Sequence, residues 1–222
     1  MSTKNYPLDT LEDIKQMMER SSRFISLSGL SGVSAGFCAL AGAWFAMDVI
    51  DDNRGSVHNL RKTTQETSMG DISIADYMGN ELFWIAVFTF CASLITAFIF
   101  TYLRSKKKGI PIWGATARRV AVNLAVPLLA GGVYLVALIQ NKAFGLIAPG
   151  CLIFYGLAVL NASKYTLAET KYLGYSEILV GIISLFFSGE GIWFWAFGFG
   201  LLHIIYGTVM WWRYERNEAP NP

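Results

Sequence analysis

Long apolar runs separated by shorter polar stretches dominate the hydropathy pattern of this chain. A helix that crosses a bilayer needs about 20 predominantly apolar residues, and six runs in the sequence approach or exceed that length. We therefore predict an all-α, polytopic membrane bundle of six transmembrane helices. The predicted spans are Phe24–Met47, Leu82–Leu103, Val120–Gln140, Gly145–Ser163, Tyr172–Ser188 and Ile192–Trp212.

The fifth run is the weakest of the six. Its strictly apolar core, Ile178–Phe187, covers only about half of a membrane span. A complete crossing and a re-entrant or displaced helix therefore both stay open for this segment.

Basic residues are distributed unevenly between the loops that join the predicted spans. With the N-terminus inside, fourteen Lys and Arg residues fall on the inner side and four on the outer side, which accounts for all eighteen. Cytoplasmic loops are enriched in Lys and Arg, so both termini are predicted to be cytoplasmic. The predicted parts are a cytoplasmic amphipathic N-terminal helix at 1–23, a transmembrane domain at 24–212 that contains an outer loop at 48–81, and a cytoplasmic tail at 213–222.

The N-terminal segment carries its own helical pattern. Apolar side chains recur at near-helical spacing from Leu8 to Phe24, directly before the first span. Such a helix either lies on the inner leaflet, in contact with membrane lipids, or docks onto a cytoplasmic protein partner.

Composition narrows the chemistry that the chain can carry. A formal net charge of only +2 makes nucleic acid a poor candidate partner. Cys38, Cys91 and Cys151 lie inside apolar runs without CxxC or CxxH spacing, and His58 and His203 are the only histidines. Because no cluster supplies the three protein ligands of a catalytic zinc site, we predict no metal and no cofactor.

Small residues mark two helix faces. Ser28, Gly32 and Gly36 recur at four-residue intervals in the first span, while Gly200 and Gly207 lie close to a histidine in the last. Small side chains allow helix backbones to approach closely within a membrane. We predict that both faces pack on other helices, either within the chain or in a homo-oligomer.

Pro127 interrupts the third span. It has no N–H to donate to the carbonyl group of Asn123, so a kink or a loosened turn is predicted there. The Asn123 side chain can repair part of the freed backbone or bond to a neighbouring helix, and a hinge for transport is the alternative.

A few polar side chains at membrane depth form the candidate site for a polar ligand or a proton. Such groups are costly in a membrane and are functional candidates by default. Three of them are predicted near the cytoplasmic ends of their spans, where pairing of Glu177 with Arg or Lys is the structural alternative. The candidate residues are His203, Glu177, Asn123 and Asn161.

His203 is predicted near the middle of the membrane. It lies eight residues from both Trp195 and Trp211, about 12 Å along a helix from each. A neutral histidine there can donate one hydrogen bond and accept another. A packing role and a proton or ligand role therefore remain alternatives.

Three segments of the chain resemble an uncharacterised family of bacterial six-span inner-membrane proteins. They are SSRFISLSGLSG (Ser21–Gly32), GLIAPGCLIFYGLAVLNASKYTL (Gly145–Leu167) and FWAFGFGLLHIIYG (Phe194–Gly207). The resemblance implies a multi-pass protein of the bacterial inner membrane, and it carries no catalytic residue with it.

Three classes of function fit this sequence. A small-solute or ion transporter or channel is favoured narrowly, because polar groups and a proline lie at membrane depth. The alternative is a non-enzymatic signalling, scaffold or assembly protein that acts through helix–helix and N-terminal helix contacts. An enzyme is least favoured, since no GxSxG or HExxH motif and no paired acid and base are present.

Overall fold

The computed structural model describes residues 28–60, 81–109, 113–187 and 189–216. Every regular element in these ranges is helical. The predicted N-terminal helix at 1–23, residues 61–80 of the predicted outer loop and the end of the tail lie outside the described residues. The elements are α2 (Gly29–Leu60), α4 (Glu81–Lys108), α5 (Ala115–Gln140), η1 (Phe144–Leu146), α6 (Ile147–Ala162), η2 (Ser163–Tyr165), α7 (Thr170–Ser184), α8 (Gly191–Trp195), the π-helical segment η3 (Ala196–Leu202) and α9 (His203–Tyr214).

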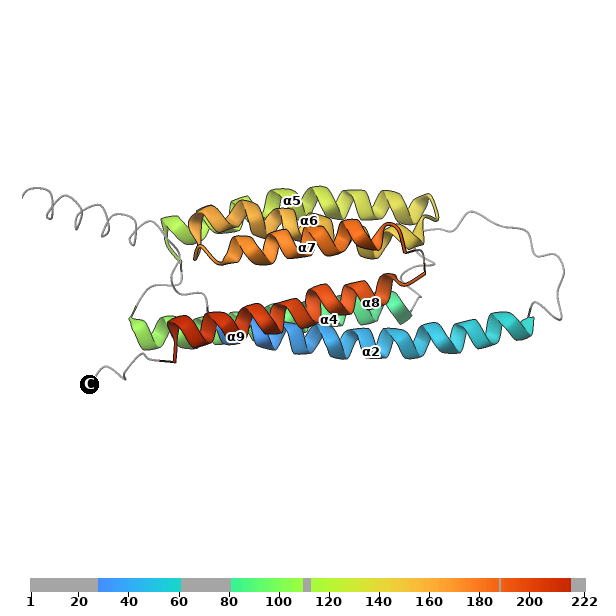
Figure 1. Ribbon diagram of the computed structural model, residues 1–222, viewed down its shortest axis with the longest axis horizontal. Helices are drawn as coiled ribbons and strands as arrows, with labels where there is room; N and C mark the ends of the chain where they lie inside the picture. Colours follow the sequence, from blue (N-terminus) through green and yellow to red (C-terminus); the bar gives the residue numbers. More distant parts are fainter. Residues whose placement is uncertain (1–27, 61–80, 110–112, 188, 217–222) are drawn as a thin grey trace, which may run out of the picture.

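The helices form two layers of three rods (Figure 1). One layer holds α5, α6 and α7, and the other holds α2, α4 and the continuous rod made by α8, η3 and α9. The layers meet where α8 and η3 contact α6 and α7. The last rod therefore belongs to one layer and provides the surface on which the other layer packs.

Within the described residues, five helical segments are long and apolar enough to cross a membrane: Gly29–Asp51, Glu81–Lys108, Ala115–Gln140, Phe144–Tyr165 and Gly191–Tyr214. The remaining helix, α7, has only 15 residues. At 1.5 Å per residue it is about 22 Å long, shorter than the roughly 30 Å hydrocarbon core. The predicted span Tyr172–Ser188 thus begins earlier and stops sooner than expected, and it lies beside α6 as a short helix of the bundle.

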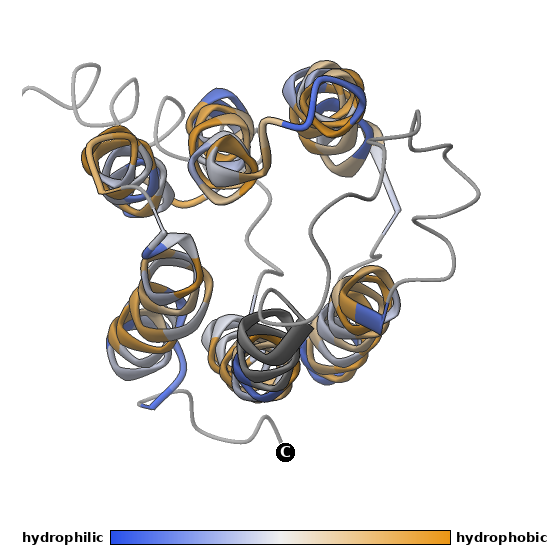
Figure 2. Ribbon diagram, turned by 90° about the vertical axis from the view of Figure 1, so that its right-hand side faces the viewer, coloured by the Kyte–Doolittle hydropathy of each residue, from blue (hydrophilic) through white to orange (hydrophobic). Residues whose placement is uncertain are grey.

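The outward faces of the bundle are apolar, as expected for a protein embedded in a membrane. Figure 2 looks along the helices and shows hydrophobic colour over most of them. Large apolar side chains such as Trp44, Phe88 and Val133 are 74%, 67% and 73% exposed. Soluble monomers rarely present apolar surface on this scale, so lipid is the natural neighbour of these faces.

One predicted boundary differs markedly from the structure. α2 continues to Leu60, well past Met47, where the first apolar run ends. The first part of the predicted outer loop is therefore helical. A helix does not need to stop where hydrophobicity stops, because polar residues with adequate helix propensity can extend it into water.

Lys and Arg side chains gather at one end of the bundle. This end, called the basic end below, is where α4 and α9 finish and where α5 and α7 begin. α4 terminates there at Gly109, whose φ of 65° suits the left-handed residue that commonly ends a helix. Of the described basic side chains only Lys142 lies elsewhere, and the others are Arg104, Lys106, Lys107, Lys108, Arg118, Arg119, Lys164, Lys171, Arg213 and Arg216.

Candidate functional site

Two ionisable side chains meet in the interior of the bundle. Nδ1 of His203 on α9 lies 3.3 Å from Oε1 of Glu177 on α7. Glu177 has no exposed surface and His203 is 6% exposed. Burying a charge is very unfavourable unless it is paired or neutralised, so a carboxylate at this position needs either a proton or a charged partner.

Glu177 lies deeper than its position in the sequence predicts. It was expected about a turn inside the cytoplasmic boundary, where Arg or Lys could neutralise it. In the structure it is the central residue of Thr170–Ser184, and it lies against His203. The reason is the short span of α7, which places the middle of this helix opposite His203, near the middle of the antiparallel rod made by α8, η3 and α9.

A third side chain, Tyr155 of α6, completes the cluster. Its hydroxyl oxygen lies 2.6 Å from His203 Nε2. On the other side of the ring, Nδ1 lies 3.2 Å from the carbonyl oxygen of Gly198. A carbonyl oxygen can only accept a hydrogen bond, so we place the proton of a neutral His203 on Nδ1, and the Tyr155 hydroxyl then donates to Nε2.

The π-helical segment makes room for this cluster. A Cβ at Gly198 would lie 2.6 Å from Glu177 Oε2 and would overlap the side chain of Leu152. Glycine is therefore required where the Glu177 carboxylate packs against η3. Single π-helical turns are rare and are often found at functional sites, and this one precedes His203 directly.

The geometry brings together three groups that can each hold a proton. With Glu177 ionised and His203 neutral, the pair carries one negative charge; with one more proton it is neutral, whichever residue holds that proton. Tyr155 can donate to a neutral His203 and accept from the Nε2 proton of a charged one. The cluster can therefore change its charge without losing its hydrogen bonds.

The other two candidate residues form a separate structural unit. Asn161 Nδ2 on α6 donates to the carbonyl oxygen of Asn123, at 2.9 Å. This is the carbonyl that Pro127 leaves without its helical donor. The Asn123 side chain instead donates to the carbonyl oxygen of Arg119, at 2.8 Å. Repair of the proline site thus comes from the neighbouring helix.

The glycine-rich faces of the first and last spans pack on each other within the chain. A Cβ on Gly32 would lie 3.2 Å from Gly207 Cα, and one on Gly36 would lie 2.7 Å from the carbonyl oxygen of Gly200. Gly29 joins this face, because its own Cβ would overlap the backbone of α9. The face of α2 is therefore covered by η3 and α9.

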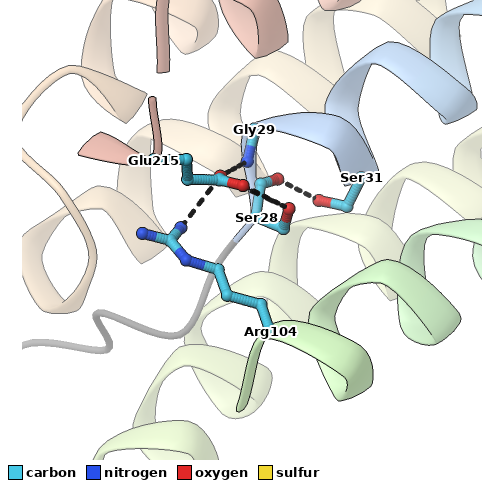
Figure 3. A network of polar contacts seen from close by, with 5 residues as sticks. All are labelled: Ser28, Gly29, Ser31, Arg104 and Glu215. Atoms are coloured by element: carbon cyan, nitrogen blue, oxygen red, sulfur yellow. Dashed lines mark hydrogen bonds and ion pairs between the residues drawn. The ribbon is translucent and has the colours of Figure 1, made fainter. Parts of the chain in front are cut away.

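Ser28 has a different position from these glycines. It precedes α2, and its hydroxyl donates to the two Glu215 carboxylate oxygens at 3.3 and 3.2 Å (Figure 3). The Gly29 N–H donates to Glu215 Oε1 at 2.5 Å, and Arg104 lies 3.1 Å from the same oxygen. Arg104 and Glu215 are only 7% and 12% exposed. This network ties the ends of α2, α4 and α9 together at the basic end.

Tyr155, Gly198, Arg104 and Glu215 were missed as site residues by the sequence analysis. Tyr155 is a polar-tipped aromatic in an apolar run, which does not reveal its partner. Arg104 is one of several basic residues that mark topology, and its burial distinguishes it only in three dimensions. Glu215 did carry a weak signal, as a lone acid between Arg213 and Arg216.

Within the described residues, no three His, Cys, Asp or Glu side chains come together as a metal site. Comparison of the chain with protein-family models, curated proteins and solved structures finds no match. The Glu177–His203–Tyr155 cluster is therefore the feature of this chain that bears most directly on its function.

Proposed function

We propose that this chain is a small-solute or ion transporter or channel that binds a proton at the Glu177–His203 pair. One observation carries the proposal. A carboxylate with no exposed surface faces a histidine at 3.3 Å in a bundle whose outer surface is apolar. Ionisable residues buried in membrane bundles commonly mark proton relays and ion pathways.

Protonation of this pair would act directly on the contact between the two layers. Glu177 and Tyr155 belong to one layer, and His203 belongs to the other. The deprotonated pair holds an uncompensated negative charge in surroundings of low dielectric, where charge is strongly disfavoured. Proton loss would thus favour separation of α7 from α9 and entry of water, which is the movement that a coupled transporter needs.

The proposed location is the bacterial inner membrane, with the basic end in the cytoplasm. The clustering of Lys and Arg at that end supports this orientation. The resemblance of the three quoted segments to bacterial inner-membrane proteins supports the location.

The alternative is a non-enzymatic scaffold or assembly protein, acting through the small face of the first span and the N-terminal helix. Intramolecular packing of Gly32 and Gly36 on α9 weakens it, because a partner would have to use another surface. None of the described contacts favours a scaffold or assembly role over transport or conduction.

Charge displacement in reconstituted proteoliposomes tests the proposal. The membranes are adsorbed on a solid support and given a rapid pH jump, and the current is recorded without and with a panel of small ions and solutes. Glu177→Gln removes the ionisable group with little change in size. Glu190→Gln, at an exposed carboxylate outside the cluster, is the matched control.

We expect a pH-jump current in the unaltered protein and in Glu190→Gln, and loss of that current in Glu177→Gln. A ligand that converts the transient current into a sustained one would identify the transported species. Equal currents in Glu177→Gln and in the unaltered protein would refute the proposal.

A further inference from the structure

We infer that the Glu177–His203 pair exchanges its proton with the basic end of the bundle, along the seam between α7 and the rod made by α8, η3 and α9, and that the other half of this seam is closed. The inference rests on the proposed function, because it names the side from which the same site is reached. It follows from the different chemistry of the two halves of the seam.

Three buried polar residues lie on one face of α7 and divide the seam into equal halves. Thr170, Glu177 and Ser184 are seven residues apart and are 7%, 0% and 2% exposed. Seven residues correspond to two helical turns, or about 10.5 Å. Thr170 therefore lies as far from Glu177 toward the basic end as Ser184 lies toward the opposite end.

The half that leads to the basic end is held by polar contacts between the two layers. The Thr170 hydroxyl and the Tyr206 hydroxyl lie 2.8 Å apart. Beside Thr170, Glu169 Oε1 accepts a hydrogen bond from the Tyr214 hydroxyl at 2.7 Å and lies 3.1 Å from an Arg213 nitrogen.

These contacts reach the surface, since Arg213 is 66% exposed. Hydroxyl and carboxylate groups exchange their partners for water readily when a seam loosens. A proton that leaves His203 or Glu177 toward this end would meet the Tyr206 and Thr170 hydroxyls next, and then the Glu169 carboxylate. It would pass to water beyond Glu169, without any net change at the hydroxyl groups.

The other half of the seam is filled by apolar groups. Glu177 Oε2 packs against Gly198 and close to Leu152, which is fully buried. The Ser184 hydroxyl is buried and has no hydrogen-bond partner in the described structure.

Aromatic rings also pack in this half. The centroids of Phe187 and Phe194 are 5.6 Å apart, and those of Trp195 and Phe199 are 5.1 Å apart. Water would have to enter this half against close packing, beside a buried Ser184 hydroxyl that has no hydrogen-bond partner among the described residues, which is unfavourable.

Thiol accessibility at the two equidistant positions tests the inference. Cys38, Cys91 and Cys151 are first replaced by alanine, and Thr170→Cys and Ser184→Cys are then introduced separately. Each variant, in nanodiscs open on both faces, is exposed to a charged, membrane-impermeant methanethiosulfonate, and the modification rate is followed by intact mass. Each variant is compared only if its helicity is near that of the unaltered protein and its elution profile is monodisperse.

We expect modification of Thr170→Cys to be at least about tenfold faster than that of Ser184→Cys, because the rate reports local opening to water. Faster reaction at Ser184→Cys, equal rates, or no reaction at either position would each overturn the inference. If either variant misfolds, Tyr206→Cys and Ala196→Cys, which lie three and seven residues from His203 on the facing rod, compare the two halves of the seam.

This experiment is independent of the test of function. Thiol modification needs no transported ligand and no current. The expected access pattern together with unchanged pH-jump currents in Glu177→Gln would refute transport but leave the access route standing. Loss of the current together with equal labelling rates would refute only the route.

Discussion

The carboxylate of Glu215, at the C-terminal end of α9, lies 2.5 Å from the backbone nitrogen of Gly29, at the start of α2. The first N–H groups of a helix lack intrahelical partners, and a negative charge at that end is favourable. Glu215 therefore caps a helix that begins 186 residues earlier in the chain. Its second partner, Arg104, fastens the end of α4 to the same point.

Removal of the Arg104 charge should loosen this end of the bundle. Arg104→Met leaves Glu215 buried with less compensation, and we expect a loss of about 3 kcal/mol in the free energy of unfolding, at the lower end for a broken buried pair. Lys107→Met removes the same charge from an exposed site on the same helix. This change should alter the free energy of unfolding by less than about 0.5 kcal/mol. Unfolding in mixed detergent micelles gives both values, and equal losses would show that the Arg104–Glu215 contact contributes nothing.

A methyl group between α2 and α9 should be far more damaging than one on the open face of α5. A Cβ on Gly207 would lie 2.5 Å from the carbonyl oxygen of Gly29, whereas nothing lies within 4 Å of a Cβ on Gly132. Gly207→Ala should lower the free energy of unfolding by about 2 kcal/mol or more through overpacking. Gly132→Ala should be neutral or stabilising by up to about 1 kcal/mol, because alanine is the better helix former. Comparable thermal stability of the two variants in detergent would contradict the close packing of α2 on α9.

A double-mutant cycle can isolate the hydrogen bond from Asn161 to the Asn123 carbonyl group that Pro127 leaves free. Asn161→Leu should lower the free energy of unfolding by about 1 kcal/mol, within the range found for interhelical hydrogen bonds in membranes. In a Pro127→Ala background the backbone regains the N–H that the Asn123 carbonyl needs, so the same change should then have little effect. Equal losses in the two backgrounds would mean that Asn161 does not act through the proline site.

The helical class of the fold and most of its membrane-spanning segments could be predicted from the sequence, because span length and hydropathy are local properties. The glycine positions also pointed to close approach between helices. Which helix meets which is a property of the tertiary structure, so the contact of Gly32 with α9 was left open. The same limit applied to Glu177, because its depth depends on how the 15-residue helix α7 is placed between longer helices. Its distance along the sequence from a predicted boundary suggested Arg or Lys as its partner, whereas the structure places it against His203.

The π-helical segment could not be foreseen either. Its sequence, AFGFGLL, contains glycine but no element that distinguishes a wide turn from an ordinary one. The segment forms where the carboxylate of Glu177 and the side chain of Leu152 press on Gly198. Tyr155 was missed for a similar reason, since its hydroxyl finds its partner, His203, only in the tertiary structure.

The carbonyl oxygen of Gly198 should determine which nitrogen of His203 carries the proton. In the unaltered protein, ¹⁵N NMR of labelled His203 at a pH where the ring is neutral should show the proton on Nδ1, because this nitrogen lies 3.2 Å from a carbonyl oxygen that can only accept a hydrogen bond. Tyr155→Phe removes the partner of Nε2 but leaves this carbonyl in place, so we expect the proton to stay on Nδ1, as it should in the control Tyr165→Phe on η2. A predominantly Nε2-protonated ring in the unaltered protein would contradict the assignment.

The most direct test of the proposed proton site is an infrared titration of the protein in lipid membranes. Difference spectra across the pH range should contain a carboxylic acid band that disappears in Glu177→Gln, persists in Glu190→Gln and shifts in His203→Phe, because the Glu177 carboxyl group lies 3.3 Å from the His203 ring. A spectrum that is unaffected by Glu177→Gln at every pH would contradict the claim that this buried pair binds and releases a proton.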